Sequence, residues 1–484
     1  MHLDETFQDV QQKSSRSIKW VGIAELFIRI VQFGTSIALA RLLFPQDFGL
    51  MSIVLVFLQM AYVLFDFGFS SALIQKKTIT RQHITTTFST YLVSAFVFTL
   101  LIVLLSRRIA DFFGHPILAG MLKTLTVIFF LYSLSALPKI QLMRELKFKQ
   151  LSRFQMISIV VYSLTAIYFA WQGYGAWCFV FGSLAEQLTI TGLLFWYTRW
   201  RPGLQWQWSI FKELFNFGGN VLGTRIVGYL NANAPYFIIG KILGATLLGF
   251  YSLAYQLIDY PVQRITKNVL KVMFPAFSRL QDDQVHYRQL YLQTLYYTTL
   301  VTFPIFAGLV LIAPEFVRFV YGHKWHAAIV PLKILAVVGL ARSLWTTASV
   351  VFLSRGKPHI EFRINLGFAL VLIPALLLAT RFGIEGVALA LAAVLLTFYG
   401  IALIHAMRIA GITIGDVWKA LRIPVQGIVG FILLGFFLKS FLARHWTDGA
   451  VLAFLIGVSI ITYGLLVYRS DRQIVTKFFR FLGQ

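Results

Sequence analysis

The chain has 484 residues, of which 58% are hydrophobic and 13% are charged, and its mean hydropathy is +0.74. A water-soluble fold of this composition would lack the polar residues needed to cover its surface, which excludes a soluble protein. The formal net charge of +24 does not indicate nucleic-acid binding, because the basic residues lie in short loops between apolar runs and form no single stripe.

Apolar runs punctuated by Pro, Gly and charged residues predict an all-α integral membrane protein with about 14 transmembrane helices, since about 20 apolar residues span the hydrocarbon core. Gly, Ser and Thr are scattered through the runs, without the alternating segments of a transmembrane barrel. The predicted helices lie at 18–40, 47–73, 84–105, 117–138, 152–171, 174–198, 214–236, 243–262, 291–313, 326–352, 364–380, 384–405, 423–438 and 449–468.

The loops on the two sides of these helices differ in charge. The side that includes both termini carries 29 Lys and Arg residues, and the opposite side carries nine. Cytoplasmic loops of membrane proteins retain positive charge, so both termini are predicted to be cytoplasmic.

One helical hairpin occurs twice in the sequence. ARLLFPQDFGLMS at 40–52 and GKILGATLLGFYS at 240–252 share Leu, Gly and Ser at an offset of 200, and FFGHP around Gly114 resembles VYGHK around Gly322. These repeated segments predict two copies of a six-helix unit in the same orientation, with the substrate path between them, as in some secondary transporters.

The repeat predicts the following organisation: an N-terminal cytoplasmic segment at 1–17, a six-helix lobe at 18–200, a cytoplasmic linker at 201–213, a second six-helix lobe at 214–410, transmembrane helices 13 and 14 at 411–468, and a basic cytoplasmic tail at 469–484.

Three motifs carry a family resemblance. Residues 39–77 contain LARLL-x-P-x-DFGL and D-x-G-x-SSALIQ, and FPAFSRLQDD follows at 274–283. They resemble the polysaccharide transporter (Wzx/WzxC-type lipid-linked oligosaccharide flippase) family of the multidrug/oligosaccharidyl-lipid/polysaccharide flippase superfamily. The resemblance implies a MATE-like V of two six-helix lobes with two extra C-terminal helices.

The same resemblance implies a function in the bacterial cytoplasmic (inner) membrane. The substrate would be an undecaprenyl-diphosphate-linked oligosaccharide, moved by alternating access from the inner to the outer leaflet for the assembly of exopolysaccharide, O-antigen or capsule. Membrane lipids, the polysaccharide polymerase and the export machinery are the expected partners, and nucleic acid is not. No cofactor is expected, and a proton or sodium ion could couple transport.

Charged side chains at the centre of a membrane helix cost about 2.5 to 3.5 kcal/mol on insertion scales, so each one needs a partner, water or a ligand. A guanidinium offers a planar fork of donors that matches phosphate oxygens. The residues predicted to line a cavity for diphosphate and sugar are Arg29, Arg225, Arg342, Gln32, Asn216, Asn220 and Asn231. The acidic residues predicted either to couple an ion or to pair with these arginines are Glu25, Asp66 and Glu186.

Two other functions stay open at this point. A multidrug or cation antiporter of the same superfamily would use the same lobes around a smaller, more apolar chamber. A membrane enzyme of polysaccharide assembly, such as a polymerase or ligase, would need an acid/His constellation. No HExxH and no GxxxxGK[ST] motif occurs in the sequence, so we predict neither catalytic residues nor a metal site.

Overall fold

The computed structural model describes residues 7–76, 78–201, 203–442 and 446–470, with the backbone alone for 7–19, 217–221, 224, 263–272 and 470. The described residues are helical and contain no β-strand. Residue contacts divide the chain into two compact units, Met1–Ala245 (unit 1) and Thr246–Gln484 (unit 2).

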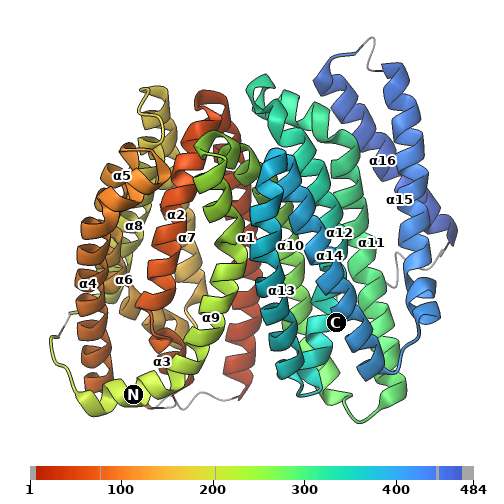
Figure 1. Cartoon of the computed structure of the whole chain (residues 1–484). Helices are drawn as coiled ribbons and strands as arrows, with labels where there is room; N and C mark the ends of the chain where they lie inside the picture. The colour runs from red at the N-terminus through yellow and green to blue at the C-terminus, as the bar shows by residue number, and fades with distance from the viewer. Residues whose placement is uncertain (1–6, 77, 202, 443–445, 471–484) are drawn as a thin grey trace. The chain divides into compact units, whose positions relative to one another are not determined.

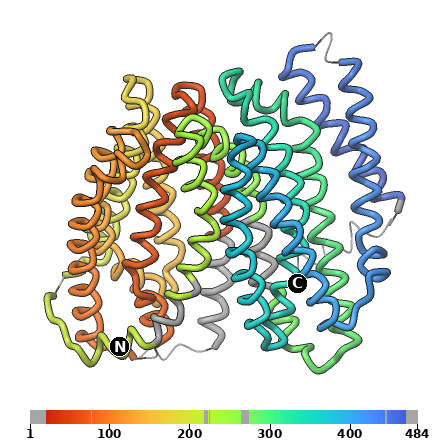
Figure 2. Tube along the Cα trace, in the orientation of Figure 1, coloured from red at the N-terminus to blue at the C-terminus, as the bar shows by residue number. Residues whose placement is uncertain are grey.

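Unit 1 consists mainly of long helices that lie side by side (Figures 1 and 2), and α3 and α5 are its shortest helices. Its helices are α1 (Phe7–Leu42), α2 (Pro45–Phe65), α3 (Phe69–Gln75), α4 (Arg81–Phe113), α5 (Ile117–Leu125), α6 (Val127–Arg144), α7 (Phe148–Trp171), α8 (Trp177–Thr198) and α9 (Trp208–Ile242). Helix α7 packs between α1 and α8, whereas α9 packs against α2, α3 and α4.

Unit 2 holds the remaining long helices and three short irregular turns. Its elements are α10 (Ala245–Arg279), which begins at the last residue of unit 1, α11 (Gln284–Phe316), the π-helix η1 (Val317–Tyr321), the 3₁₀ turn η2 (His323–Ala328), α12 (Ile329–Ser354), α13 (Pro358–Ala379), the 3₁₀ turn η3 (Thr380–Phe382), α14 (Gly383–Ala410), α15 (Ile414–Leu442) and α16 (Asp448–Ser470). Helix α12 packs between α11 and α14.

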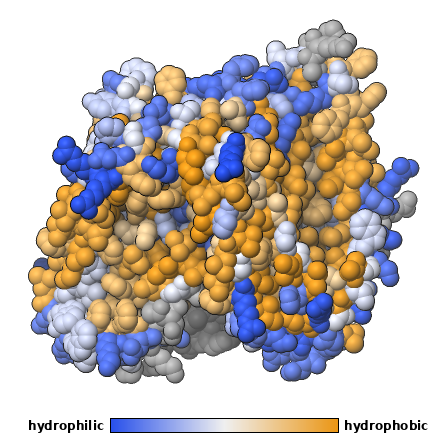
Figure 3. Space-filling view, viewed as in Figure 1, coloured by the Kyte–Doolittle hydropathy of each residue, from blue (hydrophilic) through white to orange (hydrophobic). Residues whose placement is uncertain are grey.

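The surfaces of both units are suited to lipid. Large apolar side chains such as Leu104, Leu164, Leu370 and Phe437 are exposed, and Figure 3 shows hydrophobic atoms over the middle of the helices with hydrophilic atoms gathered at their ends. Eleven candidate membrane spans occur among the described residues, and one of them, Pro358–Ala410, contains both α13 and α14. The chain is therefore a multi-pass membrane protein, and the count of 14 spans stays a prediction.

The helix boundaries agree with the repeated hairpin. Helix α1 ends at Leu42 and α2 begins at Pro45, and 200 residues later α9 ends at Ile242 and α10 begins at Ala245. At the first turn, the Asp47 carboxylate accepts the Phe44 backbone N–H across 2.9 Å, and Pro45 supplies the fixed φ that suits a first helical position.

The second repeated segment places a glycine with positive φ at the end of a helical run in both units. Gly114 follows the end of α4 with φ of 74° and is in the left-handed helical conformation, and Gly322 follows η1 with φ of 100° and a different ψ. L side chains disfavour a positive φ, which explains a glycine at both positions.

The predicted helix 47–73 is interrupted. Helix α2 ends at Phe65, and Phe67 and Gly68 have φ of 46° and 76° before α3 begins at Phe69. The break turns Asp66 toward the N-terminus of α3, where its carboxylate can accept free backbone N–H groups.

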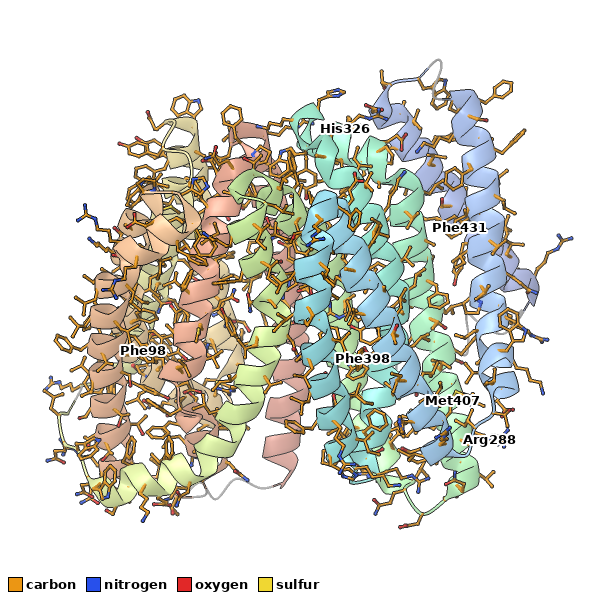
Figure 4. All side chains as sticks on the ribbon, in the orientation of Figure 1. Phe98, Arg288, His326, Phe398, Met407 and Phe431 are labelled. Atoms are coloured by element: carbon orange, nitrogen blue, oxygen red, sulfur yellow. The ribbon has the colours of Figure 1, made fainter. Side chains whose placement is uncertain are left out.

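The last two helices, α15 and α16, are anchored to α11. Glu315 near the end of α11 is buried, and Lys439 of α15 donates to its Oε2 across 2.8 Å. Arg318 lies 3.1 Å from Asp448 at the start of α16, and the Tyr463 hydroxyl donates to the Leu300 carbonyl across 2.8 Å. Phe431 of α15, labelled in Figure 4, packs in the small apolar core between these helices.

Candidate functional site

Unit 1 contains a hydrogen-bonded group of side chains, the Asp66 cluster, which consists of Asp66, Ser70, Tyr91 and Arg225. The Asp66 Oδ1 accepts the Ser70 backbone N–H across 3.1 Å, the Ser70 hydroxyl across 2.6 Å and the Tyr91 hydroxyl across 2.6 Å. The Arg225 Nη1 donates to Asp66 Oδ2 across 2.8 Å. The cluster thereby joins α2, α3, α4 and α9.

The two charges of the Asp66 cluster differ in accessibility. The Asp66 side chain is 9% exposed, whereas that of Arg225 is 39% exposed. Four donors satisfy the buried carboxylate, as a buried charge requires. Part of the Arg225 guanidinium stays accessible, although its Nη2 also donates to the Ser71 hydroxyl across 3.3 Å.

The short helix α3 is held at its other end by Arg144. The Arg144 Nη1 donates to the carbonyls of Leu73 and Lys76, each across 2.7 Å. A cation at this place also interacts favourably with the negative end of the helix dipole. Both ends of α3 are therefore fixed by charged side chains, Asp66 at the first and Arg144 at the last.

Unit 2 contains a second charged group, the Arg342 cluster, which consists of Tyr255, Asp259, Arg342, Trp345 and Tyr399. The Arg342 Nη1 lies 3.1 Å from Asp259 Oδ1, and the two side chains are 29% and 23% exposed. Tyr255 and Tyr399 lie close to Arg342, and the rings of Trp345 and Tyr399 lie 5.3 Å apart.

The predicted residues of α1 are only partly brought together. Arg29 donates to Gln32 Oε1 across 3.2 Å, and both Arg29 and Glu25 are exposed. Asn216 is exposed and Asn231 is half-buried in α9. These residues stay predicted members of a site.

The side chain of Asn220 lies outside the described residues. Glu186 of α8 is half-buried near Tyr62, and among the side chains that the structure describes none forms a hydrogen bond or ion pair with it. No group of three or more His, Cys, Asp or Glu side chains suited to a metal occurs within the described residues.

Several residues in or beside the two clusters are not among those predicted for the site. Lys139 follows the predicted helix 117–138, but α6 continues to Arg144, and Lys139 interacts electrostatically with Asp66. Tyr91, Trp345 and Tyr399 lie in apolar runs. In such a run, an aromatic residue that lines a site cannot be distinguished by its type from one in the core or at the membrane interface. No signal in the sequence alone distinguishes Trp345 and Tyr399, because Tyr399 lies on a different helix from Arg342 and Trp345.

The fold and these clusters define an all-helical, multi-pass membrane protein with a partly exposed Arg–Asp pair in each of two units. Residues 38–330 match the model of the polysaccharide biosynthesis protein family, and the chain belongs to that family.

Curated relatives come from several bacteria. The chain is 28% identical over 371 residues to the lipopolysaccharide biosynthesis protein WzxC of Escherichia coli (strain K12), covering 76% of this chain and 75% of the relative. It is 27% identical over 365 residues to the teichuronic acid biosynthesis protein TuaB of Bacillus subtilis (strain 168), covering 73% and 74%.

Solved structures share the fold. The lipid II flippase MurJ in an inward closed conformation matches with a TM-score of 0.75 at 16% identity, covering 94% of this chain and 99% of that one. An inward-facing multidrug resistance MATE family transporter of the MOP superfamily matches with a TM-score of 0.63 at 12% identity, covering 82% and 98%. The predicted family resemblance is thus confirmed, and the fold is MurJ- and MATE-like.

Proposed function

We propose that this protein is a flippase that moves undecaprenyl-diphosphate-linked oligosaccharide repeat units from the inner to the outer leaflet of the bacterial cytoplasmic membrane. Membership of the polysaccharide biosynthesis protein family, relatives named for lipopolysaccharide and teichuronic acid biosynthesis, and a fold shared with a lipid II flippase support this function. The protein would transport its substrate without a chemical step.

The observation that carries the proposal is the partly exposed Arg–Asp pair within each unit. A charged pair inside a membrane helix bundle is costly unless it meets water or a polar ligand. Arg225 and Arg342 each keep accessible donors while an aspartate offsets their charge in the absence of substrate. At the Arg225 pair, where Lys139 adds a second cation near Asp66, a diphosphate can compete with the aspartate for the guanidinium, which makes binding reversible.

The proposed transport cycle is alternating access between a site open to the inner leaflet and a site open to the outer leaflet. Both termini would be cytoplasmic, the lobes would lie at 18–200 and 214–410 as the repeat predicts, and the polyprenyl tail would stay in lipid. The polymerase and export machinery would receive the product outside.

Glu186 is the better candidate than Asp66 for carrying a coupling proton. Asp66 already accepts from four donors, one of them a guanidinium, which stabilises its charged form. Glu186 has no such donors among the described side chains, so its protonation breaks no ion pair that the structure describes. Export by Glu186→Gln should lose any dependence on the proton gradient, and unchanged dependence would exclude this role.

The proposed function is tested in cells depleted of the protein. Mass spectrometry measures their lipid-linked oligosaccharides, and a membrane-impermeant glycan probe reports the leaflet in which these lipids lie. A flippase predicts complete repeat units confined to the inner leaflet. Incomplete sugars would indicate an enzyme, and a changed drug tolerance with a normal leaflet distribution would indicate a multidrug exporter.

A further inference from the structure

The Arg342 cluster lies at one depth within unit 2. Asp259 comes 14 residues after the first residue of α10, Arg342 comes 13 after that of α12, and Tyr399 comes 16 after that of α14. With a rise of about 1.5 Å per residue, each lies roughly 20 to 24 Å along its helix. Arg342 is therefore close to the middle of α12.

The cluster cannot face hydrocarbon. Arg342 and Asp259 are 29% and 23% exposed, and a charged pair in contact with lipid at mid-span is strongly disfavoured. The face of unit 2 that carries these side chains must therefore meet water or a polar ligand.

Aromatic rings surround the charged pair on neighbouring turns. Trp345 lies three residues after Arg342 on the same face of α12, and Tyr255 lies four residues before Asp259 on the same face of α10. The Trp345 and Tyr399 rings are 5.3 Å apart with an interplanar angle of 32°, and all three aromatic side chains are half-buried. Flat apolar surface is therefore accessible beside both charges.

Packing of α14 explains why Tyr399 reaches this cluster. Its neighbour Phe398, labelled in Figure 4, packs edge-on against Phe368 of α13 with ring centroids 5.9 Å apart. Successive residues of a helix point about 100° apart, so Tyr399 is directed away from α13 and meets Trp345 of α12.

The combination of groups matches a sugar ring. A pyranose presents an apolar C–H face, which aromatic rings can cover, and hydroxyls, which can donate to Asp259 and accept from Arg342. The formal charges of Arg342 and Asp259 cancel. The cluster should therefore bind a diphosphate less tightly than an isolated arginine would, and an organic cation less tightly than an isolated aspartate would.

The Asp66 cluster differs from the Arg342 cluster in charge. Lys139 interacts electrostatically with Asp66, so a second cation lies close to the Arg225–Asp66 pair. Tyr91 is fully buried and donates to Asp66, whereas the half-buried ring of Tyr132 lies near the same carboxylate. Aromatic side chains therefore border both charged pairs, and the additional cation distinguishes the Asp66 cluster.

We infer that the Arg342 cluster is a sugar-binding subsite that stacks a pyranose ring of the oligosaccharide on Trp345 and Tyr399, while Asp259 and Arg342 bind its hydroxyls. The inference rests on the proposed function and adds that recognition of the glycan is separate from recognition of the diphosphate. Trp345 and Tyr399 are then specificity-determining residues.

The test uses the full-length protein in nanodiscs and two probes: undecaprenyl diphosphate without sugar, and the lipid-linked oligosaccharide fraction from cells depleted of the protein. Trp345→Leu and Tyr399→Leu should each lower the affinity for the glycosylated probe roughly tenfold and leave the affinity for undecaprenyl diphosphate unchanged. Trp345→Phe, which keeps a ring, should retain most of the affinity. Trp418→Leu, at an exposed position of α15, should match the wild type with both probes.

Three results would overturn the inference. Trp345→Leu and Tyr399→Leu could bind the glycosylated probe as tightly as the wild type does. The two variants could instead lose affinity for both probes equally, which would indicate that Trp345 and Tyr399 have a structural role. Tetraphenylphosphonium could bind the wild type and not Trp345→Leu, which would assign the cluster to organic cations. If the wild type binds neither lipid, the proposed function fails as well, so the two failures are distinguishable.

Discussion

Arg225 of α9 donates to the Asp66 carboxylate across 2.8 Å, although the two residues are 159 positions apart in the sequence. Asp66 is nearly buried and Arg225 is partly exposed. In the proposed mechanism Asp66 holds Arg225 in place and competes with the diphosphate for it. In that mechanism the pair would be both a structural contact and a regulator of substrate affinity.

Substitution of Arg225 and substitution of Asp66 should have opposite effects on the affinity for undecaprenyl diphosphate. Arg225→Ala should weaken binding of undecaprenyl diphosphate at least roughly tenfold, because charge-assisted donors are lost. Asp66→Asn should strengthen it, because the competing charge is removed from a side chain of the same size and the amide nitrogen, a donor, cannot replace the oxygen that accepts from Arg225. Binding to the purified protein measures both effects, with Asp111→Asn on the exposed surface as the control. Weaker binding by Asp66→Asn in a normally folded protein would contradict the competition.

The contact between Lys439 and Glu315 should stabilise the packing of α15 on α11. Lys439→Met would leave the buried Glu315 with Arg318 at 3.5 Å as its remaining cation. Removal of one partner of a buried ion pair typically costs about 3 to 5 kcal/mol, and Arg318 should reduce this to about 2 kcal/mol. A lower thermal midpoint in detergent is expected. Lys439→Met combined with Glu315→Gln should recover much of the loss, and a double variant no more stable than the single one would refute the ion-pair explanation.

Arg144 should control the local stability of α3. Arg144→Met removes donors to the carbonyls of Leu73 and Lys76, at a cost of about 1 to 2 kcal/mol for hydrogen bonds from a charged group. Hydrogen–deuterium exchange in residues 69–76 should then become roughly tenfold faster, with little change elsewhere. Arg108→Met, at an exposed position of α4, is the matched control. Equal exchange in the two variants would mean that α3 does not depend on this cap.

The N-terminus of α11 should give a pH-dependent contribution to stability. The Asp283 carboxylate accepts the His286 backbone N–H across 3.1 Å and contacts His286 Nδ1 at 2.6 Å, and these hydrogen bonds lower the pKa of Asp283. Its stabilising effect is therefore complete above the unfolded pKa of about 3.9 and is lost as the pH falls through the lower folded pKa. The thermal midpoint of Asp283→Ala should be below that of the wild type at pH 7, and the difference should shrink toward pH 3. A difference that stays constant would contradict this assignment.

Much of the fold follows from local sequence patterns. Apolar runs and their Gly and Pro punctuation predict helices near the observed positions, and the repeated hairpin predicts turns after Leu42 and Ile242. These features depend on residues that are close together in the chain, so they can be predicted from the sequence. The break at Phe67 and Gly68 was not predicted, because a single glycine between apolar residues is compatible with a continuous helix.

The candidate site was predictable only in part. Arg225, Arg342 and Asp66 were identified because charges inside apolar runs are costly. Their actual partners could not be assigned, since Asp66 and Arg225 come from distant helices and Asp259 lies 83 positions before Arg342. Trp345 and Tyr399 were missed because an aromatic residue in a membrane helix carries no signal of its own until its neighbours are known.

The most direct test of the proposed function is translocation of lipid-linked oligosaccharide by the purified protein in proteoliposomes. A membrane-impermeant glycan-oxidising reagent added outside measures the fraction of substrate in the outer leaflet with time. The wild type should make the inner-leaflet pool accessible, whereas Arg225→Ala should do so much more slowly. Accessibility no greater than in liposomes without protein, under each ion gradient applied, would contradict a flippase.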